Sequence, residues 1–414
     1  MIKILDCTFR DGGYYNKWDF NSSLVQKYLY ALDSANIDVI ELGFRNFPHD
    51  QFLGAFAYTT DNYIDTLNID KSITVGVMID AGSILNSELS IDDAVNSLFQ
   101  AKEKSRVDLV RIATHFECIE QCKEIAEALK KLGYMIGLNL MQPHAKSNQE
   151  LSKTARSIQS WNTVDVLYFA DSLGSMNGGD VVRILSALKS GWKGDIGFHA
   201  HNNKGLAVSN ILTAIEQGVV WIDSTVLGMG RGAGNAQTEN LLLELEKYQL
   251  DYHASALFDL VLSEFTPLQN HYHWGESLLY SLAAKHNIHP TYIQEMLADN
   301  RYSNKEVLQA VEFMSSIDAS HYDQDLLLQA RGNINNQGSW SAKDWCTNKE
   351  VLILGSGASL QTYKQGIVQY IKANKPIVIS LNVKHDFPTN MIDVYASSNE
   401  SKMLSEATLY SQLN

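Results

Sequence analysis

The stretch DIGFHAHNNKGLAVSNILTAIEQG, residues 195–218, contains one complete strand–turn–helix unit. It begins as a short apolar strand, and a polar turn then leads into a segment whose apolar residues recur at helical spacing. Side chains of a strand alternate between its two faces, so we expect His199 and His201 on the same side, a few ångströms apart. Two neutral imidazoles in this arrangement suit a divalent transition metal, although structural histidine pairs are also common.

The same pattern recurs along the chain before and after this unit. Seven further short apolar strands are predicted at 2–6, near 40, and at 73–80, 109–114, 135–140, 166–171 and 221–226. The helices predicted after them lie at 22–37, about 52–68, after Ser90, and at 118–133, 147–160, 179–191 and 235–248. Between the first strand and its helix, residues 7–21 (CTFRDGGYYNKWDFN) are predicted to form a polar turn.

Eight strand–helix units in about 250 residues predict a (β/α)₈ TIM barrel. The strands are short, apolar and β-branched, as expected when both faces of a parallel sheet are buried. An open doubly wound sheet is the alternative, but no glycine-rich dinucleotide loop follows the first strand.

Changes in pattern along the chain predict four segments. Residues 1–255 form the barrel, 256–328 a helical extension, 329–345 a linker, and 346–414 a short, partial Rossmann-like α/β unit. The last segment contains VLILGSGASL (351–360), a strand and glycine turn of the kind that can cradle a phosphate. With so few residues left to build a sheet, we expect a structural stub or a truncated domain there and not a nucleotide site.

Composition excludes several classes of protein. The 414 residues carry 33 Lys and Arg against 47 Asp and Glu, a net charge of −14, and no basic run, which disfavours nucleic acid and anionic membranes as partners. The four cysteines make no disulfide framework, and Cys118 and Cys122 are predicted to be reduced helix residues. A polar N-terminus and the absence of a membrane-length apolar run predict a cytoplasmic protein.

Polar residues concentrate where the predicted strands end, and this rim is where such barrels build their active sites. Asp11, His199 and His201 together offer a carboxylate and two nitrogens, which would leave positions on a divalent metal for water and substrate. The other polar residues at this rim are Arg10, Glu41, Arg45, Asp80, Arg111, Thr114, His115, Asn139, Asp171, Ser172, Thr225 and Asn235.

Four motifs carry a resemblance to a known family. LDCTFRDGG (5–13), DSLG (171–174), HAHNNKG (199–205) and GMGRGAGN (228–235) follow one another at different strand ends. Together they resemble the DRE-TIM metallolyase superfamily, which includes HMG-CoA lyase and 2-isopropylmalate synthase, over about residues 1–320. The last motif, with AAKHNIHPTYIQ (283–294) in the extension, looks closest to the 4-hydroxy-2-oxovalerate aldolase branch.

The resemblance implies a set of roles. Asp11, His199 and His201 would hold a divalent metal, with Mn²⁺ the first choice and Mg²⁺, Co²⁺ or Zn²⁺ as alternatives. Asn235 matches a position that is a metal ligand in some members and only neighbours the ligands in others. Arg10 would stabilise an enolate oxygen, and Ser172 would help to hold the carboxylate of a 2-oxo acid. For Glu41 we expect a buried carboxylate that orients Arg10 or Arg45 without reacting.

One departure from the aldolase branch concerns the proton. A histidine that acts as acid and base on the substrate 4-hydroxyl is replaced here by Tyr14, within DGGYYN. Either Tyr14 or Tyr15 takes this role, or His115 or His144 does, or the reaction differs, or the tyrosines only wall the pocket. A free tyrosine has a pKa near 10; a nearby cation and metal would lower it, whereas burial would raise it.

The predicted function is that of a carbon–carbon lyase. It would form or cleave a bond of a 4-hydroxy-2-oxo acid, giving pyruvate or a related 2-oxo acid and an aldehyde, through a metal-stabilised enolate. A Claisen-type synthase that joins an acyl-CoA to a 2-oxo acid, and a non-catalytic assembly platform, are the alternatives. The resemblance also implies a homo-oligomer and a partner enzyme docked on the helical extension.

Overall fold

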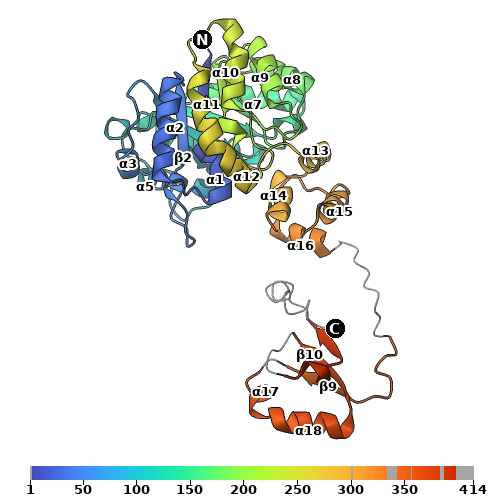
Figure 1. The fold of residues 1–414 in the computed structure, drawn as a ribbon. Coiled ribbons are helices and arrows are strands. Elements are labelled where there is room, and N and C mark those ends of the chain that lie inside the picture. Colours follow the sequence, from blue (N-terminus) through green and yellow to red (C-terminus); the bar gives the residue numbers. More distant parts are fainter. Residues whose placement is uncertain (1, 300–301, 333–342, 356, 383–386, 398–414) are drawn as a thin grey trace. The chain divides into compact units, whose positions relative to one another are not determined.

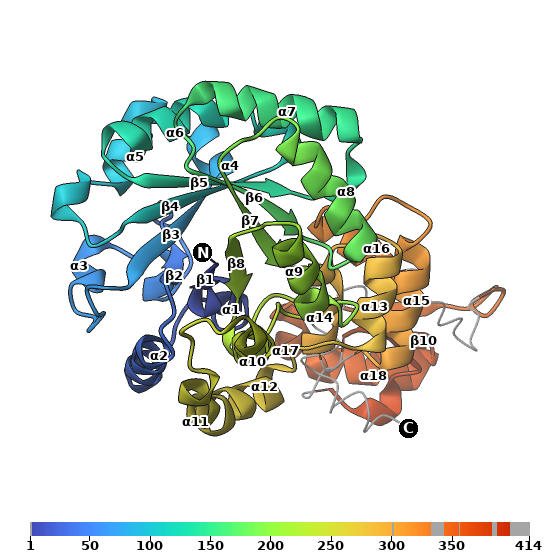
Figure 2. The ribbon, with the colours of Figure 1, turned by 90° about the horizontal axis from the view of Figure 1, so that it is seen from above.

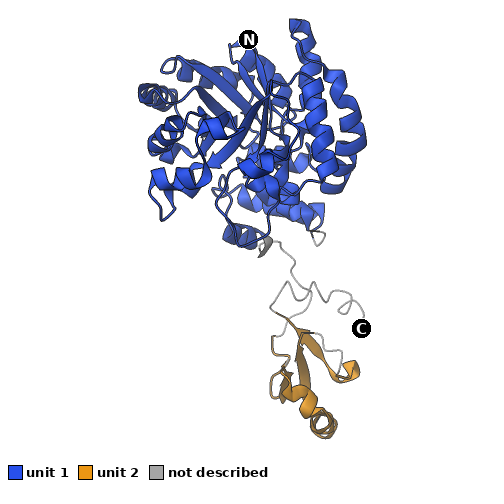
Figure 3. Ribbon diagram, turned by 90° about the vertical axis from the view of Figure 1, so that its left-hand side faces the viewer, with its two compact units in different colours: residues 1–334 blue, residues 335–414 orange. Residues whose placement is uncertain are grey.

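The computed structural model describes residues 2–299, 302–332, 343–355, 357–382 and 387–397. The chain divides into two compact units, residues 1–334 and 335–414 (Figure 3). Each unit is described by itself.

The first unit contains a closed barrel of eight parallel strands, as the sequence predicts (Figures 1 and 2). The strands follow one another around the barrel in chain order, and β8 closes it by pairing with β1, Lys3 opposite Trp221. Their bounds are β1 Lys3–Asp6, β2 Val39–Phe44, β3 Thr74–Asp80, β4 Leu109–Thr114, β5 Met135–Met141, β6 Val166–Asp171, β7 Asp195–Ala200 and β8 Trp221–Ser224.

Helices enclose the strands from outside (Figure 2). Several begin where a polar residue can accept a hydrogen bond from the first turn, as Asn21, Ser90 and Ser147 do. The barrel helices are α2 Ser22–Ser34, α3 Asp61–Ile64, α4 Ala81–Leu85, α5 Ile91–Leu98, α6 Cys122–Lys131, α7 Asn148–Trp161, α8 Gly178–Lys189, α9 Ala207–Glu216 and α10 Thr238–Leu245.

The predicted turn at 7–21 is wrong over much of its length, because Thr8–Asn16 form a helix, α1. Two adjacent glycines disfavour a helix in isolation, but here the surroundings need them. A Cβ on Gly12 would lie 2.8 Å from the Met229 side chain, and one on Gly13 would lie 2.0 Å from the Trp18 ring. Tertiary packing, and not propensity, therefore makes this segment helical.

Two other helix predictions need correction. The segment 52–68 forms only a 3₁₀ turn, Ala55–Ala57, and the short α3. Thr59 lies between them with φ +38°, a left-handed conformation that ends the first turn. Helix α6 begins at Cys122, so Cys118 lies outside it in a separate 3₁₀ turn, and both cysteines are free thiols.

The barrel interior is layered. At the N-terminal ends of the strands it is apolar, with Leu5, Val39, Leu109, Val166 and Trp221 in one cluster. Two residues further along four of these strands, and so on the same inward face, the positions are polar: Glu41, Arg111, Tyr168 and Asp223. The barrel thus changes from a hydrophobic plug to a charged layer as it approaches the C-terminal rim.

After α10 the chain is helical, as predicted. The helices are α11 Phe258–Leu260, α12 Thr266–Tyr272, α13 Leu278–Lys285, α14 Pro290–Ala298, α15 Asn304–Met314 and α16 Gln324–Gly332. Figure 1 shows α13 to α16 grouped at the end of the barrel that carries α1. Helix α16 takes in 329–332, which the sequence analysis assigned to a linker; 333–342 lie outside the described residues.

The second unit is a small parallel sheet of order β11-β10-β9, in line with the predicted partial α/β unit. Its elements are β9 Val351–Leu354, α17 Ser359–Thr362, α18 Lys364–Asn374, β10 Ile377–Leu381 and β11 Val394–Ala396. Leu354, Ile371, Val378 and Phe387 form its core. No helix among the described residues of either unit is long and apolar enough to cross a membrane.

Candidate metal centre

Three predicted ligands converge at the C-terminal rim. Asp11 comes from α1, His199 from β7, and His201 from the turn directly after it; all three are buried. The Nε2 atoms of the two histidines are 3.3 Å apart. Asp11 Oδ2 lies 3.7 Å from Nε2 of His201 and 3.9 Å from Nε2 of His199. The structure therefore brings the two histidines, which the strand periodicity places on one face, together with Asp11 from α1, which follows the first strand.

The spacing of these atoms fits a divalent metal. A point in their plane lies about 2.1 Å from each, which is the usual bond length from such an ion to imidazole nitrogen or carboxylate oxygen. Asn235 is the fourth group. Its amide donates to Asp11 Oδ2, whereas its own Oδ1 is buried without a hydrogen-bond partner in the described part of the chain. That unsatisfied acceptor beside the three donors is what a bound cation or its water would satisfy.

A chain of buried ion pairs surrounds this cluster. Arg10 Nη1 donates to Asp11 Oδ1 and Arg10 Nε to Glu41 Oε2, both at 2.7 Å. Arg111 continues the chain, with Nε 2.7 Å from Glu41 Oε1 and Nη1 2.7 Å from Asp223 Oδ2. Glu41 therefore contacts Arg10 directly, as expected, and does not pair with Arg45.

The charges in this network also favour a cation. Three carboxylates, on Asp11, Glu41 and Asp223, face two guanidinium groups, on Arg10 and Arg111. With neutral imidazoles, one negative charge remains uncompensated in a buried site, which costs free energy. A divalent cation would reverse that charge.

Asp223 orients His199, and the sequence analysis missed it. His199 Nδ1 lies 2.9 Å from Asp223 Oδ2, so Nδ1 carries the proton and the Nε2 lone pair faces Asp11 and His201. Burial lowers the pKa of His199 despite this carboxylate, which keeps the imidazole neutral as a ligand should be. A carboxylate inside the buried strand Trp221–Ser224 is a signal that could have been used, because it must have a partner.

The three carboxylates are ionised at neutral pH. Burial alone would raise the pKa of Asp11, but the charge of Arg10 holds it well below its usual range. Burial would also raise the pKa of Glu41 and of Asp223, but the charge of Arg111 outweighs it and lowers both. The site therefore presents Asp11 as a charged ligand without further titration.

A second group of donors, Cys7, His199 and Asp223, lies close together in the barrel. Burial raises the pKa of the Cys7 thiol well above its usual value, which disfavours the thiolate that binds metals. Asp223 is also held by Arg111 at 2.7 Å, where a metal ion would meet a positive charge. The cluster of Asp11, His199 and His201 is therefore the better metal site.

Ser172 follows the strand next to the one that carries His199. It is buried directly after β6, whose last residue, Asp171, pairs with Ala200 between the two histidines. No hydrogen bond of the Ser172 hydroxyl is seen among the described residues, so it is free for a ligand. Asp171 holds its own loop by accepting from the amides of Ser175 and Met176, and burial raises its pKa to about 6.

Tyr14 lies at the mouth of the site, with 38% of its surface exposed. Its ring packs against Trp18 and Phe44, and the guanidinium carbon of Arg231 is 5.3 Å from the ring centre. Desolvation raises the pKa of Tyr14, and the charge of Arg231 only partly opposes this. For the pKa of Tyr14, desolvation thus outweighs the charge of Arg231.

The other residues considered for the proton transfer are Tyr15, His115 and His144, and each has neighbours outside the three metal ligands. Tyr15 donates its hydroxyl to the carbonyl oxygen of Gly232 at 2.9 Å. His115 packs against His321, with ring centres 5.3 Å apart. Burial lowers the pKa of His144, whose charged neighbours, Asp180, Arg183 and Lys204, all lie outside the metal cluster.

Two rim residues do not join the site. Arg45 pairs with Asp61 at 3.0 Å and donates to the carbonyl of Thr59, so it holds a loop. Asp80 caps α4 by accepting from the amide of Gly82 and is exposed. The strand ends therefore supply more polar residues than the site uses.

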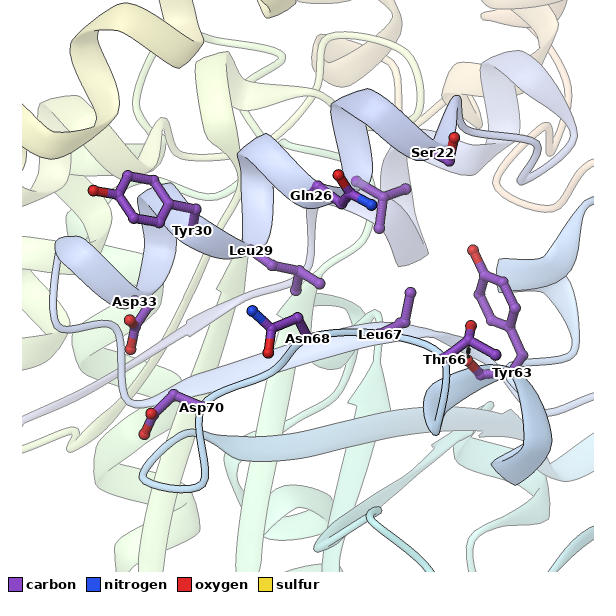
Figure 4. A pocket seen from close by; sticks show the side chains of 11 residues that line it. Ser22, Gln26, Leu29, Tyr30, Asp33, Tyr63, Thr66, Leu67, Asn68 and Asp70 are labelled. Atoms are coloured by element: carbon purple, nitrogen blue, oxygen red, sulfur yellow. Dashed lines mark hydrogen bonds between the residues drawn. The ribbon is translucent and has the colours of Figure 1, made fainter.

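A separate cavity of about 490 Å³ lies between α2 and the segment 63–70. Figure 4 shows its lining side chains, which come from these two elements. None of the predicted site residues lines it, so it is not the candidate active site.

Enzymes with this closed barrel carry their active sites at the C-terminal rim. In this chain that rim carries a carboxylate, two histidines and a fixed guanidinium. The HMGL-like family model matches residues 1–262, and the chain belongs to this family.

Curated relatives include two aldolases. The 4-hydroxy-2-oxovalerate aldolase of Carboxydothermus hydrogenoformans is 33% identical over 258 residues, 59% of this chain and 71% of the relative. That of Geobacillus genomosp. 3 is 32% identical over 252 residues, 60% and 72% of the two chains.

Solved structures share the fold. The N-terminal domain of a Bacteroides vulgatus protein is 34% identical with a TM-score of 0.66, covering 75% of this chain and 100% of that one. The HMG-CoA lyase of Bacillus subtilis, at 15% identity and a TM-score of 0.53 over 66% of this chain and 94% of that one, supports the barrel fold alone.

Proposed function

We propose that this chain is a metal-dependent aldolase. It forms or cleaves the carbon–carbon bond of a 4-hydroxy-2-oxo acid, and the products of cleavage are pyruvate, or a related 2-oxo acid, and an aldehyde. The observation that carries this proposal is the convergence of Asp11, His199 and His201 beside the fixed guanidinium of Arg10. The names of the curated relatives support the same reaction.

Asp11, His199 and His201 would hold the ion, with Asn235 Oδ1 beside them. When bound, Mn²⁺ or another divalent ion supplies a Lewis acid for the carboxylate and carbonyl oxygens of the 2-oxo acid. The neutral imidazoles and the ionised carboxylate are in the protonation states that this requires.

Arg10 would stabilise the enolate. Its Nε and Nη1 are held by Glu41 and Asp11, while Nη2 makes no hydrogen bond within the described residues. Glu41 is itself fixed by two nitrogens of Arg111. A guanidinium fixed on two sides needs no reorganisation when negative charge develops on the carbonyl oxygen, so its free nitrogen can donate to that oxygen.

Ser172 would hold the substrate carboxylate. Ser172 is a buried residue directly after β6, the neighbour of β7, and its hydroxyl makes no hydrogen bond within the described residues. A hydrogen bond from this hydroxyl would fix the rotation of the 2-oxo acid about its long axis, which sets the direction in which the fourth carbon leaves the site.

Tyr14 would carry the proton of the 4-hydroxyl. Its raised pKa keeps the phenol protonated at neutral pH, which suits donation to the aldehyde oxygen during aldol addition. In cleavage only the phenolate form of Tyr14, which the charge of Arg231 beside the ring favours, would accept the proton of the 4-hydroxyl. Tyr15 is a poorer candidate, because its hydroxyl is already bound to Gly232.

The proposal is tested with Mn²⁺-loaded protein and pyruvate in D₂O. Exchange of the C3 protons, followed by NMR, reports enolate formation, and mass spectrometry after addition of an aldehyde panel reports the aldol product. We expect both. If the protein neither exchanges these protons nor forms any product, the aldolase assignment is wrong; if it forms a product only with an acyl-CoA, the synthase is preferred.

A further inference from the structure

The helical extension covers part of the barrel mouth. Ser281 of α13 donates to the carbonyl of Asn203 in the loop after β7, at 3.0 Å. Gln294 of α14 accepts from the amide of Gly232 in the loop after β8, at 2.9 Å. The part of a ligand that reaches out of the barrel on this side therefore meets the extension.

Arg231 lies between the metal cluster and the extension. A Cβ on the residue before it, Gly230, would be 2.7 Å from Asp11 Oδ2, and one on the residue after it, Gly232, would be 2.8 Å from Pro290 Cβ. The guanidinium itself is close to the exposed ring of Tyr14. On the proposed aldolase function, the aldehyde half of a substrate that leaves the metal cluster on the side of the extension would pass Arg231.

The guanidinium of Arg231 has no anion in this structure. Within the described part of the chain it forms no ion pair and no hydrogen bond, and its Nε is buried. The other arginine side chains that are described each donate to at least one protein acceptor: Arg10, Arg45, Arg106, Arg111, Arg156 and Arg183. The buried Nε of Arg231 is thus a cationic donor without a protein acceptor, and this costs free energy unless a ligand or water supplies one.

His289 adds a second donor from the extension. Its Nδ1 accepts from the amide of Thr291 at 3.4 Å at the start of α14, so the proton is on Nε2. Burial and the charge of Arg231 lower the pKa of His289 to about 2, so it stays a neutral donor. Pro290, the residue after His289, lies against Gly232, the residue after Arg231. A neutral N–H on this side of the loop can bind an anion together with the guanidinium without adding a charge that repels Arg231.

We propose that Arg231, assisted by His289, binds an anionic group on the aldehyde half of the substrate. The acceptor is then an aldehyde that carries a carboxylate or a phosphate, both of which match the forked guanidinium. This inference rests on the proposed aldolase function. It assigns Arg231 to the aldehyde half of the substrate. Arg10 and Ser172 are already proposed to contact the 2-oxo acid, and Arg231 lies beside Tyr14, which is proposed to contact the 4-hydroxyl.

The first test compares matched aldehydes with pyruvate and Mn²⁺-loaded protein. Butanal and glyceraldehyde are neutral, 4-oxobutanoate carries a carboxylate, and glyceraldehyde 3-phosphate carries a phosphate. We expect Arg231→Gln to lower kcat/KM for the preferred anionic aldehyde by about 10- to 100-fold, since a hydrogen bond to a charged group is worth that much. The neutral aldehydes should change little, and Arg231→Lys should recover part of the loss.

Two further variants act as controls. Arg156→Gln removes the same charge from exposed α7, where Arg156 donates only to Ser152, and should leave all rates unchanged. His289→Asn keeps a side-chain oxygen to cap α14 but loses the Nε2 donor, so it should reduce the preference for the anionic aldehyde by less than Arg231→Gln.

A binding measurement separates this inference from the aldolase function. Calorimetric titration of the metal-loaded protein with inorganic phosphate or succinate should show binding that Arg231→Gln weakens by about tenfold or more. Such binding without any reaction of pyruvate or aldehydes would support the anion site and overturn the aldolase.

Three results would overturn the anion site. The first is an active aldolase with neither a preference for anionic aldehydes nor Arg231-dependent anion binding. The second is an equal loss for neutral and anionic aldehydes in Arg231→Gln. The third is slower pyruvate proton exchange in that variant, because Arg231 would then act on the 2-oxo acid.

Discussion

At the residue scale, the site is a set of charges that hold one another in place. Arg10 and Arg111 each contact two carboxylates, and Asp223 also fixes His199. Buried ion pairs are costly to form but far more costly to break singly, because the remaining partner keeps its charge in a dry site. Substitutions that keep the charge are therefore the most informative.

His201 is the cleaner of the two histidines for testing metal binding. Its Nδ1 has no partner among the described residues, whereas His199 also holds Asp223. We expect His201→Ala to lose bound Mn²⁺ in elemental analysis while its circular dichroism is unchanged. His199→Ala should lose the metal too, with a lower Tm.

The exposed His271→Ala is the control for metal lost through handling, and it should retain the metal. Full metal occupancy in both His201→Ala and His199→Ala would show that the cluster is not the metal site.

Arg10→Lys tests the enolate contact. Lysine keeps the charge but cannot hold Glu41 and Asp11 with two nitrogens and still offer a third. We expect kcat to fall by about 10² to 10³, as for loss of one oxyanion donor, with little loss of metal. A variant with near-normal turnover would exclude Arg10 from the chemistry.

Tyr14→Phe tests the proton transfer. We expect it to keep metal and to bind pyruvate while slowing cleavage of a 4-hydroxy-2-oxo acid, because only the step at the 4-hydroxyl loses its acid and base. The matched variant is Tyr15→Phe, which breaks the hydrogen bond to Gly232 and should lower stability by about 1 kcal/mol with a smaller effect on rate. Cleavage at the normal rate in Tyr14→Phe would make that residue a pocket wall.

At the scale of elements, hydrophobic periodicity was enough to predict the barrel. Strands buried on both faces are apolar throughout, and each is followed by a helix with a one-sided apolar pattern, so eight units could be counted. Helix α1 could not be predicted, because its two glycines are required by Met229 and Trp18, which come from elsewhere in the fold or later in the chain.

The same limit applies to the site. Strand alternation placed His199 and His201 together, and the rim placed Arg10 and Asp11 beside them. Arg231 and His289 could not be paired from the sequence, since their proximity depends on how the extension folds back over the barrel. Local sequence patterns thus predict which side chains share one face of a strand. They do not predict which residues of another element lie next to those side chains.

Glu239 in the first turn of α10 offers a test of how the loop after β8 is held in place. Its carboxylate accepts from the amide of Leu227, which has φ +49° in the loop after β8. Burial raises the pKa of Glu239 from 4.5 to about 7. The stability it contributes is therefore fully present below pH 4.5 and is lost as the pH rises through 7, by up to roughly 3 kcal/mol.

Glu239→Gln keeps an oxygen for Leu227 and removes this ionisation. We expect the Tm of the variant, relative to the wild type, to be higher at pH 8 than at pH 5. Glu244→Gln on the exposed face of the same helix should show no such pH dependence. A Tm difference for Glu239→Gln that does not change with pH would mean that Glu239 ionises normally.

At the scale of the molecule, the candidate site residues named above all lie in the first unit. The barrel and the extension share residues 1–334, and the second unit has its own small core. The implied homo-oligomer and the partner enzyme on the extension stay predictions; light scattering would test the first. Docking on the extension would have to leave open the route past Arg231 and Tyr14, because the extension also covers part of the barrel mouth.

The last prediction concerns the second unit. We expect a chain that ends at residue 334 to keep the Tm of the barrel within about 2 °C and to keep its kcat/KM. The physical reason is that none of Asp11, His199, His201, Arg10 or Arg231 lies in the second unit. The Bacteroides vulgatus N-terminal domain, which this chain covers completely, supports independent folding. If the shortened chain folds with the same Tm but loses most of its activity, the second unit must supply a group to the reaction, and the assignment of the whole site to the rim would be wrong.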